Sequence, residues 1–234
     1  MLVSHRHKFI FIKGVKVAGT SSEVFFQPAC QPADRPVSEG TETYEGPEGI
    51  VADRADFSKA ETRPKLRNHM SAQSILDVVG PEVFDRYVKI ANICNPFTQA
   101  LSGVYHKAFR AGRSFDELAA LQDELRQLVD RKNPFAKRLS VDGEIAVDVP
   151  IRFEALEEDC QRVARQIGYA PPAPPPHLKN RPKPFGGVPV EDILPADVVD
   201  ALLEKEAAYF RRFGYSTDPA QATAPPPILS ETAQ

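Results

Sequence analysis

The feature that most constrains the fold is a short apolar run that leads into a loop with two glycines. Residues 9–12 are FIFI, a β-rich sequence typical of a strand that is buried on both faces. Gly14 and Gly19 follow, and Thr20 and Ser21 then open a predicted helix. A strand, a glycine-containing loop and a helix in this order are the setting in which backbone N–H groups bind a phosphate or a similar anion.

The details of this loop separate it from the loop of nucleotide triphosphatases. That motif ends in Gly-Lys-Ser/Thr, whereas here Thr20 takes the place of the lysine and Lys16 lies inside the loop. No predicted strand ends in an acidic residue that would help to hold Mg²⁺, since residues 87–93 are followed by Cys94 and Asn95. We therefore expect an anion that is bound without a metal. The glycines are expected to permit positive φ angles and a close approach of the backbone, and the alternative is an ordinary turn with a stray lysine.

Strand and helix patterns alternate along the rest of the chain, which predicts an α/β fold of three layers with a mainly parallel central sheet. Further strands are predicted at 87–93 and 146–153, the latter at a sheet edge because it contains Pro150. Helices are predicted at 71–79, from 96 onward, at 114–131, at 155–169 and at 195–213. In the helix at 114–131, Ser114 and Glu117 form a predicted capping box. A leucine stripe on its face is expected to pack in a core or against a partner helix (Leu118, Leu121, Leu125 and Leu128).

The predicted domain organisation is a single domain over residues 1–217 and a disordered tail over 218–234. Within the domain, residues 28–66 form a predicted loop-rich insertion. Residues 171–189 hold eight of the 22 prolines and are expected to be extended.

Composition narrows the classes of partner. With 29 Lys and Arg against 32 Asp and Glu, the net charge of −3 argues against a broadly basic surface for long nucleic acids or anionic membranes. No apolar run approaches the roughly 20 residues that span a bilayer, and the start of the sequence has no secretory signal. Three widely spaced cysteines indicate neither a disulfide framework nor a metal site. We expect a soluble, cytoplasmic protein.

The loop resembles that of the sulfotransferases, in particular the branch that includes carbohydrate sulfotransferases. In that family PKTAGTS follows the first strand, and residues 15–21 here are VKVAGTS, which differs at two positions. The resemblance implies a P-loop nucleotide-hydrolase-like, sulfotransferase-like fold. It also implies a site for 3′-phosphoadenosine 5′-phosphosulfate (PAPS). Lys16 would stabilise the leaving phosphate, and the implied cofactor-binding residues of the loop are Gly14, Lys16, Ala18, Gly19, Thr20 and Ser21.

Weaker resemblances extend over about residues 8–215, at 68–72, 87–106, 151–159 and 210–215. In the family an arginine and a serine eight residues later bind the 3′-phosphate. Here Ser102 matches the serine, but Cys94 stands at the arginine position. Losing one charge-assisted contact costs about 2–3 kcal/mol, or a 30- to 150-fold weaker affinity. The residues that could compensate are Lys179, Arg181 and Lys183.

The resemblance makes His69 the first choice for a general base, with an exposed or helix-capping histidine as the alternative. Glu154 is either its partner or a carboxylate at a helix start. His106 and His177 are expected on the surface, and His5 and His7 in a frayed, basic N-terminus.

The leading hypothesis is a metal-independent sulfotransferase that transfers a sulfuryl group from PAPS to a hydroxyl, in particular of a saccharide. The alternative, motivated by Cys94, is a catalytically degenerate sulfotransferase-like binding protein. A phosphate-loop kinase is disfavoured by the position of Lys16.

Overall fold

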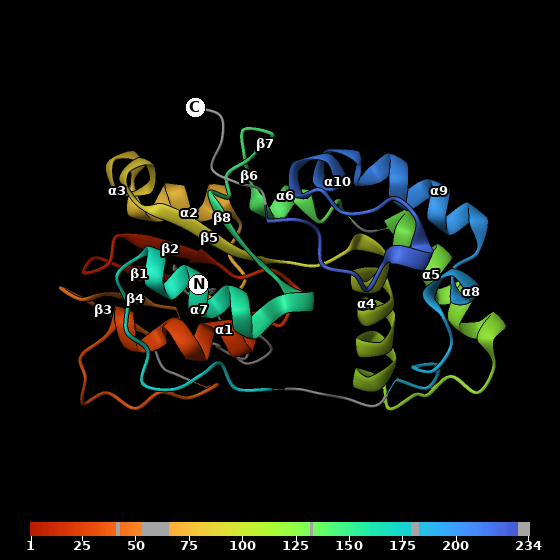
Figure 1. The fold of residues 1–234 in the computed structure, drawn as a ribbon, viewed down its shortest axis with the longest axis horizontal. Coiled ribbons are helices and arrows are strands. Elements are labelled where there is room, and N and C mark those ends of the chain that lie inside the picture. Colours follow the sequence, from red (N-terminus) through yellow and green to blue (C-terminus); the bar gives the residue numbers. More distant parts are fainter. Residues whose placement is uncertain (41–42, 53–65, 132, 179–182, 229–234) are drawn as a thin grey trace, which may run out of the picture. The chain divides into compact units, whose positions relative to one another are not determined.

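The structure is a computed structural model, and it describes residues 1–40, 43–52, 66–131, 133–178 and 183–228 (Figure 1). These residues fall into two compact units, which are described separately. The first contains Met1–Ile93 and Lys137–Leu178, and the second contains Cys94–Ala136 and the described part of Lys179–Gln234.

The first unit is built on a six-stranded sheet that is mixed rather than mainly parallel. Its strand order is β3 (Tyr44–Gly46), β4 (Gly49–Val51), β1 (Leu2–Ser4), β2 (Phe9–Ile12), β5 (Val88–Ile93) and β8 (Val149–Arg152). The pairings β3–β4, β4–β1 and β1–β2 are antiparallel, whereas β2–β5 and β5–β8 are parallel. The predicted α/β class and the three predicted strands are therefore confirmed, and β8 lies at an edge as Pro150 suggests.

Helices cover both faces of this sheet. Figure 1 shows α1 (Gly19–Phe26) and α7 (Leu156–Gln166) on one side of the strands, and α2 (Ala72–Val79) and α3 (Pro81–Arg86) on the other. Phe9 and Phe11 of β2 share a buried apolar core with Phe26 of α1 and Val163 of α7. Successive strand residues point to opposite faces, so the equally buried Ile10 and Ile12 face the other helices.

The ends of two predicted helices are confirmed by their caps. The Ser71 side chain accepts a hydrogen bond from the N–H of Ser74 at the start of α2, and Gly80 follows that helix with a φ of 80°. Gly168 follows α7 with a φ of 65°. The remaining short elements of this unit are η1 (Gln27–Cys30), β6 (Ser140–Val141), β7 (Glu144–Ile145) and η2 (Phe153–Ala155), and α6 (Ala136–Leu139) begins at its border.

The second unit is helical, with α4 (Pro96–Arg110), α5 (Leu118–Arg131), α8 (Val190–Ile193), α9 (Ala196–Lys205), α10 (Ala207–Phe213) and η3 (Pro219–Gln221). Leu121 and Leu125 are fully buried, whereas Leu118 and Leu128 are half-buried, so the leucine stripe is confirmed as core at its two central positions. The predicted capping box is wrong, because α5 begins only at Leu118 and both Ser114 and Glu117 are exposed. Phe115 is buried, and its ring packs edge-on against Tyr105 at the place where the first turn of the predicted helix would lie.

The predicted single helix over 195–213 is two helices. Glu206 separates α9 from α10, and this residue is 2% exposed. It accepts hydrogen bonds from the backbone N–H groups of Phe135 at 2.7 Å and Ala136 at 3.5 Å. The predicted helix is interrupted at Glu206, whose side chain points inward and accepts from the N–H groups of Phe135 and Ala136.

The N-terminal residues are not frayed. Leu2–Ser4 form β1 and are buried, and His5 and His7 hydrogen-bond through Nδ1 to the Tyr87 hydroxyl (2.9 Å) and the Ile167 carbonyl (3.3 Å). The sequence prediction fails here because three residues are too few to show a period, and the strand depends on pairing with β2 and β4.

Two other segments differ from the predicted loops. The insertion at 28–66 contains β3 and β4, while its residues 53–65 lie outside the described residues. The predicted disordered tail contains η3, which the Asp218 side chain caps by accepting from the N–H of Ala220, and Ala222 beyond it is 1% exposed. In the proline-rich segment, residues 171–178 contain no helix or strand, as predicted.

Candidate functional site

The glycine-containing loop occupies residues 13–18, between the carboxyl end of β2 and the start of α1. In parallel sheets, ligand sites gather at this edge. Lys16 and Ala18 lie in the left-handed region, with φ of 64° and 54°. Ala18 is also the N-cap residue of α1, and no side chain caps this helix start. The loop therefore leads a left-handed backbone into a helix whose first N–H groups have no side-chain acceptor from the cap.

The two glycines have a different role from the one predicted. Neither Gly14 nor Gly19 lies in the left-handed region, so that expectation is wrong. Glycine is required at both positions for steric reasons. A Cβ on Gly14 would lie 2.7 Å from Cγ2 of Val17, and one on Gly19 would lie 2.9 Å from Cγ of Lys13. The close approach that the glycines permit is to the loop's own side chains.

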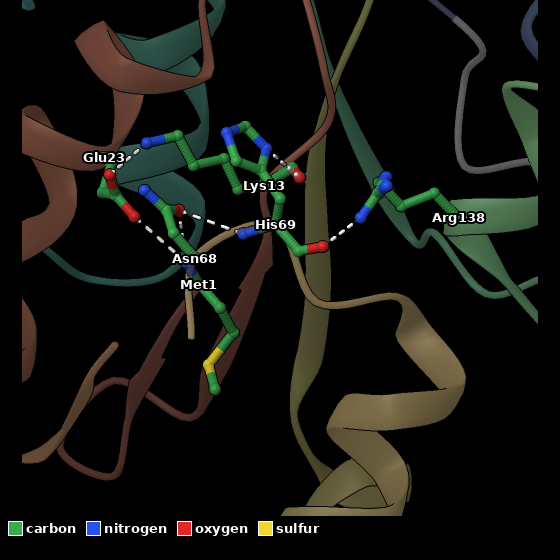
Figure 2. Close-up of polar contacts among 6 residues, drawn as sticks. All are labelled: Met1, Lys13, Glu23, Asn68, His69 and Arg138. Carbon is green, nitrogen blue, oxygen red and sulfur yellow. Dashed lines mark hydrogen bonds and ion pairs between the residues drawn. The ribbon is translucent and has the colours of Figure 1, made fainter. Parts of the chain in front are cut away.

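Beneath the loop lies an ion pair that the sequence prediction missed. Lys13 is 1% exposed and Glu23 of α1 is 6% exposed, and the Lys13 ammonium contacts Oε2 of Glu23. Oε1 of Glu23 accepts from the amino group of Met1 at 3.0 Å (Figure 2). Burial raises the pKa of Glu23, but the positive charges of Met1 and Lys13 outweigh it and hold this pKa below its ordinary value. The only sequence signal is a charged residue at each end of apolar runs, FIFIK and EVFF.

His69 lies next to the start of this loop. Its Nδ1 is 3.3 Å from the carbonyl oxygen of Lys13, and its backbone carbonyl accepts a hydrogen bond from Arg138 (Figure 2). A carbonyl oxygen can only accept, so Nδ1 carries the proton and Nε2 carries the lone pair. The backbone of His69 is left-handed (φ 56°), and its N–H donates to Oδ1 of Asn68 at 3.1 Å.

The surroundings of His69 keep its ring neutral. Burial, followed by the positive charges of Lys13, the Met1 amino group and Arg138, lowers its pKa to about 4. At neutral pH the imidazole is therefore neutral, with its proton on Nδ1 and a lone pair on Nε2 that can accept a proton. Arg138 has no signal in its local sequence, because it is brought here by the fold.

The predicted residues of the loop and His69 belong to the same unit. Lys16 is half-buried, while Thr20 and Ser21 are 9% and 2% exposed. The Ser21 hydroxyl accepts a hydrogen bond from the N–H of Leu178 at 3.3 Å, so this side chain is already engaged by the protein. Lys13 is the residue that links the loop to His69.

The residues predicted for the 3′-phosphate belong to the second unit. Ser102 is half-buried on α4. Cys94 is 2% exposed; its N–H donates to the Tyr209 hydroxyl at 3.2 Å and its thiol is 3.0 Å from Oγ1 of Thr98. Of the suggested compensating cations, Lys183 is exposed, and Lys179 and Arg181 lie outside the described residues.

The remaining acid–base candidates from the sequence are one glutamate and two histidines. Glu154 is half-buried in η2, His106 is half-buried on α4 and His177 is exposed. After β8, Arg152 forms a bidentate pair with the fully buried Asp159 of α7, with two contacts of 2.8 Å. This pair joins the strand to the helix that follows.

No family model, curated protein or solved structure matches the chain. Within the described ranges, no group of three or more His, Cys, Asp or Glu side chains could hold a metal ion. None of the helices in the described part of the chain is long and apolar enough to cross a membrane.

Proposed function

We propose that this protein is a PAPS-dependent sulfotransferase that acts on a hydroxyl group, with a saccharide as the acceptor. The observation that carries the proposal is the loop of residues 13–18. It combines a half-buried lysine, Lys16, with a left-handed backbone that enters a helix start lacking a side-chain cap at Ala18. Backbone N–H groups at a helix start favour an anion, and the VKVAGTS sequence resembles the family's loop.

The donor side of the reaction falls to Lys16. PAPS, when bound, would supply a sulfuryl group activated by a phosphate leaving group. Negative charge grows on that phosphate as the sulfur–oxygen bond breaks, and a positioned ammonium stabilises it. The loop residues Gly19 and Thr20 would hold phosphate oxygens through their backbone at the start of α1.

The acceptor side falls to His69. The acceptor hydroxyl loses its proton as its oxygen bonds to sulfur, and a neutral imidazole accepts that proton at Nε2. The hydrogen bond from Nδ1–H to the Lys13 carbonyl leaves Nε2 as the basic nitrogen. The lowered pKa of about 4 makes the ring a weak base that is ready in its neutral form at physiological pH.

One observation favours the second candidate, a binding protein without efficient transfer. Cys94 is 2% exposed and its thiol contacts Thr98, so this position offers no cation for a 3′-phosphate. A test of the 3′-phosphate site must therefore accompany the test of the loop.

The experiment is calorimetric titration with 3′-phosphoadenosine 5′-phosphate, with adenosine 5′-phosphate and with ATP, each with and without Mg²⁺. The proposal predicts roughly micromolar binding of the bisphosphate without Mg²⁺. It also predicts at least about 30-fold weaker binding of the monophosphate, because one charge-assisted contact contributes about 2–3 kcal/mol. Equal affinities would favour the degenerate binding protein, and a preference for ATP with Mg²⁺ would favour a kinase.

Lys16→Ala should abolish sulfuryl transfer from PAPS, and Lys8→Ala is its matched control. Both lysines have a positive φ, 64° and 50°, and they flank β2 at opposite ends. The two variants therefore remove the same charge with the same backbone consequence. Transfer retained in Lys16→Ala, or lost equally in Lys8→Ala, would contradict the role of Lys16.

A further inference from the structure

A lysine that touches no candidate ligand atom connects the two halves of the proposed site. Lys13 follows β2 directly, and its side chain is 1% exposed. An ammonium group is buried at high cost unless it is compensated, and the Glu23 carboxylate supplies the compensation. The pair joins the strand before the loop to the helix after it, so both ends of the loop are fixed to one another.

The methylene groups of the Lys13 side chain, its apolar stem, also limit where the start of α1 can lie. A Cβ on Gly19 would lie 2.9 Å from Cγ of Lys13 and 3.5 Å from its Cε. The apolar stem of Lys13 therefore passes directly under the first residue of α1, at a contact that only glycine allows. Gly19 is needed because of where Lys13 lies, which ties the position of the loop's anion-facing end to this one side chain.

The backbone of Lys13 performs a second task. Its carbonyl oxygen accepts from Nδ1–H of His69 at 3.3 Å and so selects the tautomer with a basic Nε2 (Figure 2). The backbone of His69 is held in place by Asn68 and Arg138, which contact its N–H and its carbonyl. A shift of Lys13 would therefore move the loop through the Lys13 side chain, and it would move His69 through the Lys13 carbonyl.

We propose that Lys13 is a positioning residue, which sets the loop against α1 through Glu23 and Gly19 and sets the His69 tautomer through its carbonyl. This inference rests on the proposed function only for what the two parts do together. Lys13 does not serve as the cation of the site, because Glu23 neutralises it inside the protein, and that task is left to Lys16.

The test removes the charges of the Lys13–Glu23 pair, and Glu23→Gln leaves an amide oxygen that can still accept from the Met1 amino group, the other partner of Glu23 at 3.0 Å. Lys13→Met combined with Glu23→Gln keeps the stem under Gly19 but breaks the ion pair. Lys89→Met combined with Asp148→Asn is the matched control, because this pair also joins two segments of the sheet region (2.9 Å) and is remote in sequence from the loop and from His69. For each folded protein, as judged by circular dichroism, we would measure two quantities: the Kd for 3′-phosphoadenosine 5′-phosphate, and the His69 tautomer by heteronuclear NMR of the imidazole nitrogens.

We expect the Lys13/Glu23 double variant to bind at least about tenfold more weakly and to lose the preference for the Nδ1–H tautomer, while the control stays within about twofold of the parent. An unchanged Kd and an unchanged tautomer would overturn the proposal, because a merely structural pair leaves both untouched once the chain is folded. If the parent protein does not bind the nucleotide but the tautomer still depends on the pair, the proposed function is wrong and the positioning role stands.

A second variant covers the case in which the double variant does not fold. Gly19→Ala leaves every charge in place and forces the Lys13 stem to move, whereas Gly40→Ala adds the same methyl group where no atom lies within 4 Å. Gly19→Ala should shift Kd and tautomer in the same direction as the double variant, and Gly40→Ala should shift neither. A folded Gly19→Ala protein with parental values for both would overturn the proposal.

Discussion

Two strand-to-helix connections of the first unit each contain a buried ion pair between the end of a strand and the next α-helix, but the backbone between the paired residues differs. After β2, the buried Lys13 pairs with Glu23 of α1, and after β8, the buried Arg152 pairs with Asp159 of α7. In each, a cation at the end of a parallel strand contacts a carboxylate on the next helix. Each pair fixes the helix to the strand that precedes it.

The two connections differ in what lies between the paired residues. Arg152 and Asp159 are seven positions apart, and the carboxylate accepts from Nε, from Nη2 and from the backbone N–H of Arg152, all at 2.8 Å. The intervening η2 has no residue in the left-handed region. The Asp159 side chain thus satisfies the backbone N–H of Arg152, and we call this connection closed.

Lys13 and Glu23 are ten positions apart, and Lys16 and Ala18 between them are left-handed. Neither α1 nor α7 has a side-chain cap hydrogen bond at its start, so the two connections differ in the backbone between the paired residues and not in the cap. The longer spacing instead makes room for a loop, residues 13–18, whose backbone is left-handed at Lys16 and Ala18. The same kind of ion pair thus occurs with a connection closed by the Asp159 side chain and with a connection that has a left-handed loop, residues 13–18, which we call the open connection.

The largest effect is expected from breaking the closed connection. Asp159→Ala leaves the Arg152 guanidinium buried without its carboxylate, which should reduce the free energy of unfolding by about 3–5 kcal/mol. The measurement is urea denaturation. Asp197→Ala is the control, since its side chain is 60% exposed in a pair with Arg126, and it should change little. A loss at Asp159 no greater than at Asp197 would show that the closed connection does not depend on the pair.

The sequence predicts the elements of this comparison but not the pairs. The apolar run at 9–12 and the following glycines locate β2, the loop and α1, because local periodicity and helix-start residues encode them. The pairing of Lys13 with Glu23 depends on the three-dimensional distance between a strand end and the second turn of a helix. Spacing alone does not determine that distance.

Other sequence predictions fail for the same reason: contacts between segments distant in sequence decide the structure there. The strands β1, β3 and β4 are three residues each, too short for a period, and they exist through antiparallel pairing with each other and with β2. The capping box at 114–117 satisfies a local rule, but burial of Phe115 decides where α5 begins. His69 was predicted from resemblance, whereas its tautomer and lowered pKa come from Lys13 and Arg138, which are distant in sequence.

A second prediction concerns pH, because the neutral, half-buried ring of His69 contacts the carbonyl oxygen of Lys13 at the start of the connection between β2 and α1. The pKa of His69 is lowered from 6.5 to about 4. Between pH 6.5 and pH 4, His69 is therefore protonated in the unfolded chain but neutral in the folded protein. Stability is therefore lost as the pH falls from 6.5 toward 4, by about 3 kcal/mol for this group. His69→Gln should remove that part of the slope in denaturation measured between pH 7 and pH 4. Identical slopes in the two proteins would show that the ring is not held neutral.

The smallest effect tests the left-handed backbone of the open connection directly. Ala18 and Ala155 are the N-cap residues of α1 and α7, with φ of 54° and −132°. Replacing either by glycine changes the N-cap residue and the entropy of the unfolded chain in the same way. Only at position 18 does the replacement also relieve a left-handed alanine, which costs about 1–2 kcal/mol.

Ala18→Gly should therefore be more stabilising than Ala155→Gly by about 1 kcal/mol in matched urea titrations. The two substitutions share every other term, so their difference reports the backbone conformation that distinguishes the two connections. Equal effects would mean that the loop before α1 relaxes out of the left-handed region in solution. The open connection would then have no preset backbone for an anion, and the proposal built on Lys16 would lose its support.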